Sequence, residues 1–298
     1  MRKVLSFIMA VIMIISVCTV LVYAEDYPQM QVEVRAKSAL LMEASTGRVL
    51  MAQNADERLY PASVTKIMSM LLVVEALENG KIQLTDVVTA SANASKKGGS
   101  QIWLKDGEQM TVDELLKATA VASANDACTA LGEYIAGSDD AFVKLMNDRA
   151  KQLGMNNTNF DNCTGLDDTA DSHYTTAYDI ALMSRELLKH DLIRNYSTVW
   201  MDTLRNGETQ LVNTNKLIKS YDGATGLKTG TTSKAGCCVS ASAERDGLEL
   251  IAVVMGSDNS NDRFNSARAM LDWGFANYSA VTLSADASLI TDVNVING

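Results

Sequence analysis

The stretch GLKTGTTSKAGCCVSASAERDGLELIAVVMGS, residues 226–257, decides the fold. Apolar side chains alternate with small or polar ones along it, and residues 245–247 (Arg-Asp-Gly) interrupt it as a turn, which predicts antiparallel strands. A further pair of strands is expected within residues 36–53, around a turn at residues 45–47. Strands are therefore expected near both ends of the chain.

The segment between these strands is mostly helical by its pattern. Apolar residues recur at three- and four-residue spacing, often behind a capping residue, in the segments 111–123, 126–137, 138–154 and 175–191. A closing helix is expected at residues 261–278. The order predicts an α/β (α+β) fold in which one antiparallel sheet is built from both ends of the domain around an inserted helical region.

Residues 1–24 have the pattern of a signal peptide. Arg2 and Lys3 precede an apolar run, residues 4–22, and Ala24 offers a small residue at the expected cleavage site. The mature chain would then be exported and begin at Glu25. An uncleaved membrane anchor stays an alternative, because the run is long enough to span a bilayer.

Composition excludes several classes of partner. The 298 residues are 47% hydrophobic and 21% charged, as in globular proteins. Without Arg2 and Lys3 the chain has 24 basic residues against 36 acidic ones, a formal charge of −12, which argues against nucleic acid as a partner. With two histidines and no zinc-type cysteine spacing, no metal or cofactor is expected.

Four cysteines remain after export: Cys128, Cys163, Cys237 and Cys238. The adjacent pair would point to opposite faces of a strand, so we interpret Cys237 and Cys238 as packing residues rather than as a mutual disulfide. Disulfides among the four stay open.

The stretch LYPASVTKIMSM, residues 59–70, places Ser63 three residues before Lys66 at the start of a long apolar run. That run predicts a buried helix, where an ammonium group is costly. Residues three apart share a helix face, and a desolvated lysine loses its proton easily, so Lys66 can act as base for a Ser63 nucleophile. Alone, Ser-x-x-Lys is also expected by chance about once in a chain of this size.

Two further motifs fit the same chemistry. Lys228, Thr229 and Gly230 lie on an expected strand, where glycine permits close backbone approach and the lysine and hydroxyl can hold a carboxylate. Ser-x-Asn occurs three times, beginning at residues 91, 123 and 257. We prefer Ser123 and Asn125, because they lie between two apolar helical segments where buried polar groups require a polar site; a chance helix cap is the alternative.

In this order the three motifs resemble those of the serine D-alanyl-D-alanine carboxypeptidases, the low-molecular-weight penicillin-binding proteins. The resemblance covers roughly residues 36–278 and includes the segments 98–128, 172–187, 222–232 and 262–275. It implies a β-lactamase/transpeptidase-like fold. It also implies removal of the terminal D-alanine from peptidoglycan stem pentapeptides, and covalent inhibition by penicillin and other β-lactam antibiotics.

The resemblance also implies the catalytic roles. Ser63 would be the acylated nucleophile and Lys66 its base. Ser123 would relay the proton to the leaving D-alanine, Asn125 would position the substrate amide, and Lys228 would support the relay. We further expect the charge on Lys228 to disfavour protonation of Lys66.

The substrate contacts follow by the same resemblance. The backbone N–H groups of Ser63 and Thr231 would form the oxyanion hole. Arg263 would bind the substrate carboxylate beside Thr229 and Gly230. A solvated surface arginine is the alternative for Arg263.

The domain organisation implied is a signal peptide (1–24), an N-terminal linker (25–35), a catalytic domain (36–278) and a stub of a truncated or absent C-terminal β domain (279–298). Because similar proteins usually carry a second domain and a membrane-binding helix, membrane association stays open.

Two competing functions are weighed. A class A-like β-lactamase needs a glutamate that activates the deacylating water, and the candidate Glu208 stands only twenty residues before Lys228. A non-catalytic wall-binding homologue is disfavoured by the complete set of polar residues. The sequence therefore predicts the carboxypeptidase, with slow release of a penicillin adduct.

Overall fold

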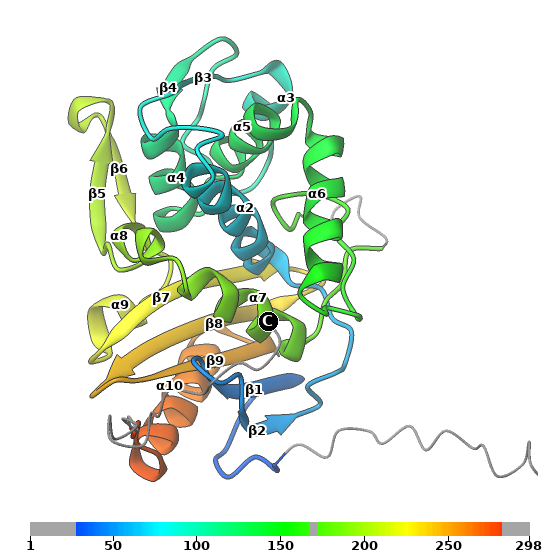
Figure 1. The fold of residues 1–298 in the computed structure, drawn as a ribbon, viewed down its shortest axis with the longest axis vertical. Coiled ribbons are helices and arrows are strands. Elements are labelled where there is room, and N and C mark those ends of the chain that lie inside the picture. Colours follow the sequence, from blue (N-terminus) through cyan, green and yellow to red (C-terminus); the bar gives the residue numbers. More distant parts are fainter. Residues whose placement is uncertain (1–27, 167–171, 282–298) are drawn as a thin grey trace, which may run out of the picture.

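The computed structural model describes residues 28–166 and 172–281 (Figure 1). Its strands are β1 (Ser38–Glu43), β2 (Val49–Gln53), β3 (Val87–Thr89), β4 (Gln109–Thr111), β5 (Met201–Leu204), β6 (Thr209–Val212), β7 (Ala224–Thr232), β8 (Gly236–Arg245) and β9 (Leu248–Ser257). Its α-helices are α2 (Lys66–Glu78), α3 (Ala92–Ser95), α4 (Val112–Val121), α5 (Asn125–Ala136), α6 (Asp139–Gln152), α7 (Ala177–Leu188), α8 (Arg194–Ser197), α9 (Leu217–Ser220) and α10 (Ser260–Asn277). Short 3-10 turns are η1 (Ala62–Thr65), η2 (Asp191–Ile193) and η3 (Arg205–Gly207).

One antiparallel sheet of five strands, in the order β2-β1-β9-β8-β7, forms the lower half of the molecule in Figure 1. The first strand pairs with the last, and Leu40 lies opposite Val253. Side chains alternate across the sheet, since Leu40 packs with the helical region while Leu41 packs toward α10. The prediction of one sheet built from both ends of the domain is confirmed.

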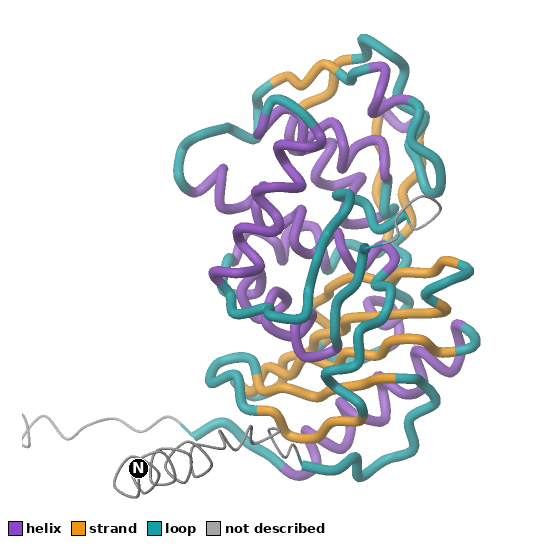
Figure 2. The backbone as a smooth tube through the Cα atoms, turned by 90° about the vertical axis from the view of Figure 1, so that its right-hand side faces the viewer, coloured by secondary structure: helices purple, strands orange, loops and turns teal. Residues whose placement is uncertain are grey.

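Helices cover both faces of this sheet. In the turned view of Figure 2, α10 lies on one side and the helical region on the other. Because α7 packs on β1, β8 and β9, it joins the sheet to the helical region that contains α2, α4, α5 and α6. The two apolar layers leave the C-terminal part of β7 beside η1, where the nucleophile motif lies.

The long helices lie where the apolar spacing predicts them, whereas the four-residue helices α3, α8 and α9 were not predicted. Helix α4 begins with a capping box, in which the side chain of Thr111 accepts from the N–H of Glu114 and the Glu114 carboxylate accepts from the N–H of Thr111. The short hairpins β3–β4 and β5–β6 were not predicted, because their strands have only three or four residues.

The predicted signal peptide and most of the predicted C-terminal stub lie outside the described residues. In the predicted linker, the carbonyl of Pro28 accepts from the N–H of Ala52 on β2 at 2.8 Å, so the chain packs on the domain from there. Among the described helices none is long and apolar enough to cross a membrane. All four described cysteines are free thiols.

Candidate active site

The first motif lies where the chain passes from η1 into α2. Ser63 is half-buried in η1, and Lys66 is the first residue of α2 and is fully buried. Nζ of Lys66 donates to Oγ of Ser63 at 2.9 Å. The sequence suggested that the two residues share one α-helix, but Ser63 lies in the 3-10 turn that precedes it. This tighter turn also keeps positions i and i+3 on one side.

The second partner of Lys66 is a backbone group. Its Nζ donates to the carbonyl oxygen of Thr164 at 2.7 Å. Oδ1 of Asn162 holds that turn, accepting from the N–H of Thr164 at 3.1 Å and from the N–H of Gly165 at 2.7 Å. Burial lowers the pKa of Lys66 to about 8, so a neutral amine is accessible near neutral pH.

The second motif lies between α4 and α5. Ser123 is buried with a φ of +62°, and α5 begins at Asn125. Nδ2 of Asn125 donates to the carbonyl of Gly98 at 2.7 Å. Its Oδ1 is buried and has no hydrogen-bond partner among the described residues, which leaves an acceptor free for a ligand amide.

The competing Ser-x-Asn copies are explained by helix capping. Ser91 caps α3 by accepting from the N–H of Ala94, and Asn259 caps α10 by accepting from two backbone N–H groups. By contrast, the N-cap position of α5 is Ala124, which offers no side-chain hydrogen bond. The copy at Ser123 is therefore the one that capping does not explain.

The third motif lies on β7, against the nucleophile turn. A Cβ atom on Gly230 would lie 2.8 Å from both the backbone N of Ser63 and the carbonyl oxygen of Pro61, so only glycine allows this approach. Oγ1 of Thr229 donates to Oγ1 of Thr214 at 2.7 Å. The backbone of β7 thus lies within contact distance of the backbone of Ser63.

Lys228 is buried, and its Nζ donates to the carbonyl of Thr229 at 3.0 Å. Burial, with the charge of Lys66 second, holds the pKa of Lys228 well below its usual range. The charge of Lys66 thus acts to lower the pKa of Lys228. The expected effect of Lys228 on the protonation of Lys66 stays a prediction.

Arg263 on α10 is not a surface residue, because only 6% of it is exposed. Its Nη1 lies 3.0 Å from the carbonyl oxygen of Gly230 and 3.1 Å from Oγ1 of Thr231. Its Nε is buried without a partner among the described residues. Burial lowers its pKa, and the guanidinium braces the part of β7 that faces Ser63.

Sequence reasoning missed several residues of this site. The contribution of Thr164 is a backbone carbonyl, which has no side-chain signal, and Asn162 and Thr214 lie in irregular segments. His173 is buried behind η1; because its Nδ1 accepts from the N–H of Asp161, its Nε2 carries the proton and donates to Thr65 Oγ1 at 2.8 Å. The available signal for these residues was a polar side chain in a segment expected to be buried near a motif.

The other candidate features contribute nothing to this cluster. Glu208, the glutamate weighed for a β-lactamase, is exposed between η3 and β6. No group of three or more His, Cys, Asp or Glu residues that could hold a metal ion occurs in residues 28–166 and 172–281.

Comparison with known proteins agrees with this geometry. Residues 24–259 match the peptidase S11 family, described as D-alanyl-D-alanine carboxypeptidase. The chain is 47% identical over 266 residues to D-alanyl-D-alanine carboxypeptidase DacF of Bacillus subtilis, covering 88% of this chain and 68% of that protein. It is 40% identical to DacC of Escherichia coli, covering 87% of this chain and 66% of that protein. The chain thus spans about two thirds of the length of these relatives.

Solved structures share the fold. Penicillin-binding protein 6B of Escherichia coli superposes with a TM-score of 0.81 at 35% identity, covering 88% of this chain and 84% of that one. Penicillin-binding protein D2 of Listeria monocytogenes, in its cefotaxime-bound form, has a TM-score of 0.76 at 32% identity, covering 83% of this chain and all of that one (100%).

Proposed function

The chain belongs to the D-alanyl-D-alanine carboxypeptidase family of S11 peptidases, and from this membership we propose that it removes the terminal D-alanine from peptidoglycan stem pentapeptides. The observation that carries the proposal is the contact of 2.9 Å between Nζ of the buried Lys66 and Oγ of Ser63. A buried lysine with a pKa of about 8 is a base matched to a serine nucleophile.

In the acylation step, Oγ of Ser63 attacks the carbonyl carbon of the penultimate D-alanine while its proton passes to Nζ of Lys66. The developing oxyanion accepts from the backbone N–H groups of Ser63 and Thr231. This assignment is supported by the close approach of Gly230 to the backbone N of Ser63.

Collapse of the tetrahedral intermediate breaks the C–N bond, and the leaving D-alanine amine needs a proton. Ser123 passes that proton from Lys66 to the amine, and the neutral or charged amine of Lys228 lines the same path. Oδ1 of Asn125 accepts from the substrate amide, since it is buried and lacks a partner among the described residues. Water then hydrolyses the ester on Ser63.

The substrate carboxylate binds at β7, beside the hydroxyl of Thr229. Arg263 acts there through its positive charge and by holding the carbonyl of Gly230 and the hydroxyl of Thr231. A charge-assisted contact of this kind is worth about 1.5 to 3 kcal/mol.

β-Lactam antibiotics acylate the same serine. Relatives with solved structures are described as ampicillin-bound and cefotaxime-bound forms, and the present site has the corresponding nucleophile and base. No glutamate among the described residues contacts Ser63 or Lys66 in the way that fast deacylation requires, so the adduct is long-lived.

The enzyme works outside the cytoplasm, after cleavage behind Ala24, and residues 36–278 form its catalytic domain. The proposal is tested by incubating the mature protein with a pentapeptide ending in D-Ala-D-Ala and measuring free D-alanine. Release by the wild type and none by Ser63→Ala is expected; intact-protein mass after penicillin should rise for the wild type alone. Equal D-alanine release by both proteins would contradict the assignment of the nucleophile.

A further inference from the structure

Trp103 is the most exposed aromatic residue among the large hydrophobic residues that the structure describes as exposed. Its relative accessibility is 73%. Its backbone has a φ of +60°, a conformation that bulky residues rarely adopt. The indole is thus held out in solvent by a backbone conformation that is unfavourable for a bulky residue. Such an outlier calls for a functional explanation.

The cause of this conformation is Asp126, the residue that follows Asn125. Its buried carboxylate accepts from the N–H of Ile102 at 3.2 Å and from the N–H of Leu104 at 2.9 Å. Because the two N–H groups flank Trp103, the carboxylate pinches the chain and turns the indole outward. The residue that fixes Trp103 therefore belongs to the same helix start as the second motif.

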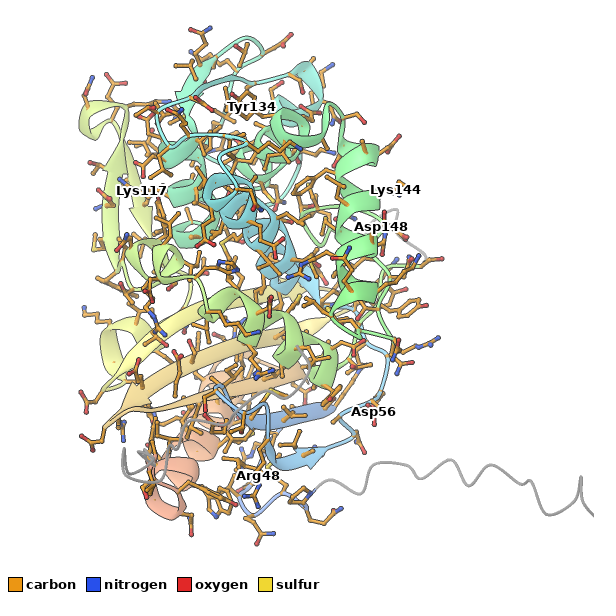
Figure 3. The ribbon with its side chains drawn as sticks, in the orientation of Figure 1. Arg48, Asp56, Lys117, Tyr134, Lys144 and Asp148 are labelled. Carbon is orange, nitrogen blue, oxygen red and sulfur yellow. The ribbon has the colours of Figure 1, made fainter. Side chains whose placement is uncertain are left out.

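A groove of about 790 Å³ lies beside the indole, between the segment 102–108 and the β5–β6 hairpin. Arg205 holds its floor, donating to Oε1 of Glu108 at 2.7 Å and to the carbonyl of Ile102 at 2.9 Å. Lys117 on α4, labelled in Figure 3, ties the hairpin to the helical region through Asp202 at 3.1 Å. The groove is thus held by charged contacts from both walls.

The lining favours one class of ligand. Arg205 and Glu108 form an ion pair, so their charges offset each other. The remaining charged residues of the lining are the carboxylates of Asp106 and Glu208 and the ammonium group of Lys105. A net negative lining disfavours an acidic peptide. A flat indole face beside carboxylate and amide oxygens suits a pyranose ring, whose C–H face packs on the aromatic ring while its hydroxyls donate to the acceptors.

We propose that Trp103 and this groove bind the saccharide ring that carries the stem peptide of the substrate. The inference rests on the proposed function, because that function supplies the glycopeptide. Four extended residues of ordinary peptide linkage reach about 14 Å, so a sugar subsite should lie near the catalytic cleft. The segment is joined to the second motif: the carbonyl of Ser100, three residues before Trp103, accepts from the N–H of Asn125 at 2.7 Å.

The test compares two substrates on the mature enzyme: a muramyl pentapeptide ending in D-Ala-D-Ala, and the same pentapeptide with an acetyl group in place of the sugar. Trp103→Ala should lower kcat/KM about tenfold for the sugar-bearing substrate and leave the sugar-free one unchanged. Trp103→Phe should keep most of the preference. Tyr134→Ala removes an exposed aromatic side chain from α5 that is not among the lining residues of the groove, and it should change neither value.

Trp103→Gly separates ligand binding from folding, because glycine adopts a φ of +60° without strain. It should have a higher Tm than Trp103→Ala and show the same loss of sugar preference. An equal loss on both substrates, or no loss on either, would overturn the proposal. If the wild type released D-alanine from neither substrate, the proposed function itself would fail, which the sugar-free peptide reports separately.

Discussion

The carbonyl oxygen of Thr164 lies 2.7 Å from Nζ of Lys66, closer than the 2.9 Å between the same nitrogen and Oγ of Ser63. A carbonyl only accepts, so one N–H bond of the lysine is directed at Thr164. The lone pair of the neutral amine is then free to face the serine hydroxyl. The geometry of the base therefore depends on a backbone turn about a hundred residues away along the chain.

The pH dependence of acylation should report Lys66. Only the neutral amine accepts the serine proton, so the second-order rate of penicillin acylation should rise about tenfold per pH unit below 8 and level off above it. Intact-protein mass spectrometry at timed intervals between pH 6 and pH 10 measures this rate. A flat profile over that range would rule out a titrating base, and Lys66→Ala should not acylate at any pH.

Stability should also depend on the charge of Lys66. In the unfolded chain a lysine keeps its proton to about 10.5, whereas the folded state releases it near 8. Because the unfolded state binds more protons in that window, the wild type should gain stability as pH rises through it, by about 3 kcal/mol. Denaturant unfolding of wild type and Lys66→Met at pH 7 and pH 10 measures this contribution together with the effect of Lys66 on Lys228. The prediction fails if the difference between the two proteins is the same at both pH values.

Gly230→Ala should separate β7 from the nucleophile turn. The added Cβ would lie 2.8 Å from the backbone N of Ser63, so the strand has to move, with a loss of about 1 to 3 kcal/mol in unfolding free energy. A misplacement of the reacting groups by about 1 Å lowers the rate of catalysis about a hundredfold. The control is Gly137→Ala at the end of α5, where φ is +87° and space is open. It should lose about 1 kcal/mol of stability and acylate at the normal rate.

Asn162 should act on the base through the turn that it holds. Asn162→Ala removes the acceptor for two backbone N–H groups, and kcat/KM should fall roughly ten- to a hundredfold. Asn162→Asp keeps an acceptor at that position but adds a negative charge near Lys66, so its acylation profile should move to higher pH. If both variants behaved like the wild type, Asn162 would have no role beyond the loop.

The sheet and the long helices could be predicted because each has a repeating pattern. Leu40 and Leu41 alternate across β1, and the apolar spacing in α4 to α7 extends over 10 to 14 residues in each helix. The hairpin β5–β6 could not, since four-residue strands have too short a pattern. Its existence matters here, because it forms one wall of the groove beside Trp103.

The sequence points to the candidate site through its side chains and gives no signal where the backbone acts. Ser63, Lys66 and the residues of β7 carry motifs that can be read directly. The carbonyl of Thr164 and the outward turn of Trp103 depend on folded geometry, and so do the lowered pKa values of Lys66 and Lys228. Burial is the largest cause of both shifts, and burial at single-residue precision follows only from packing.

The pairing of β1 with β9 determines when the sheet and the candidate site can assemble during synthesis of the chain. Ser38 pairs with Met255, so the strand made first waits for a partner made more than two hundred residues later. Until β7 to β9 have been made, η1 has no strand to lie against and Ser63 has no neighbouring backbone of Gly230. Contacts so distant in sequence close slowly. A partly made chain therefore lacks the assembled candidate site, which is complete only when the last strand is in place.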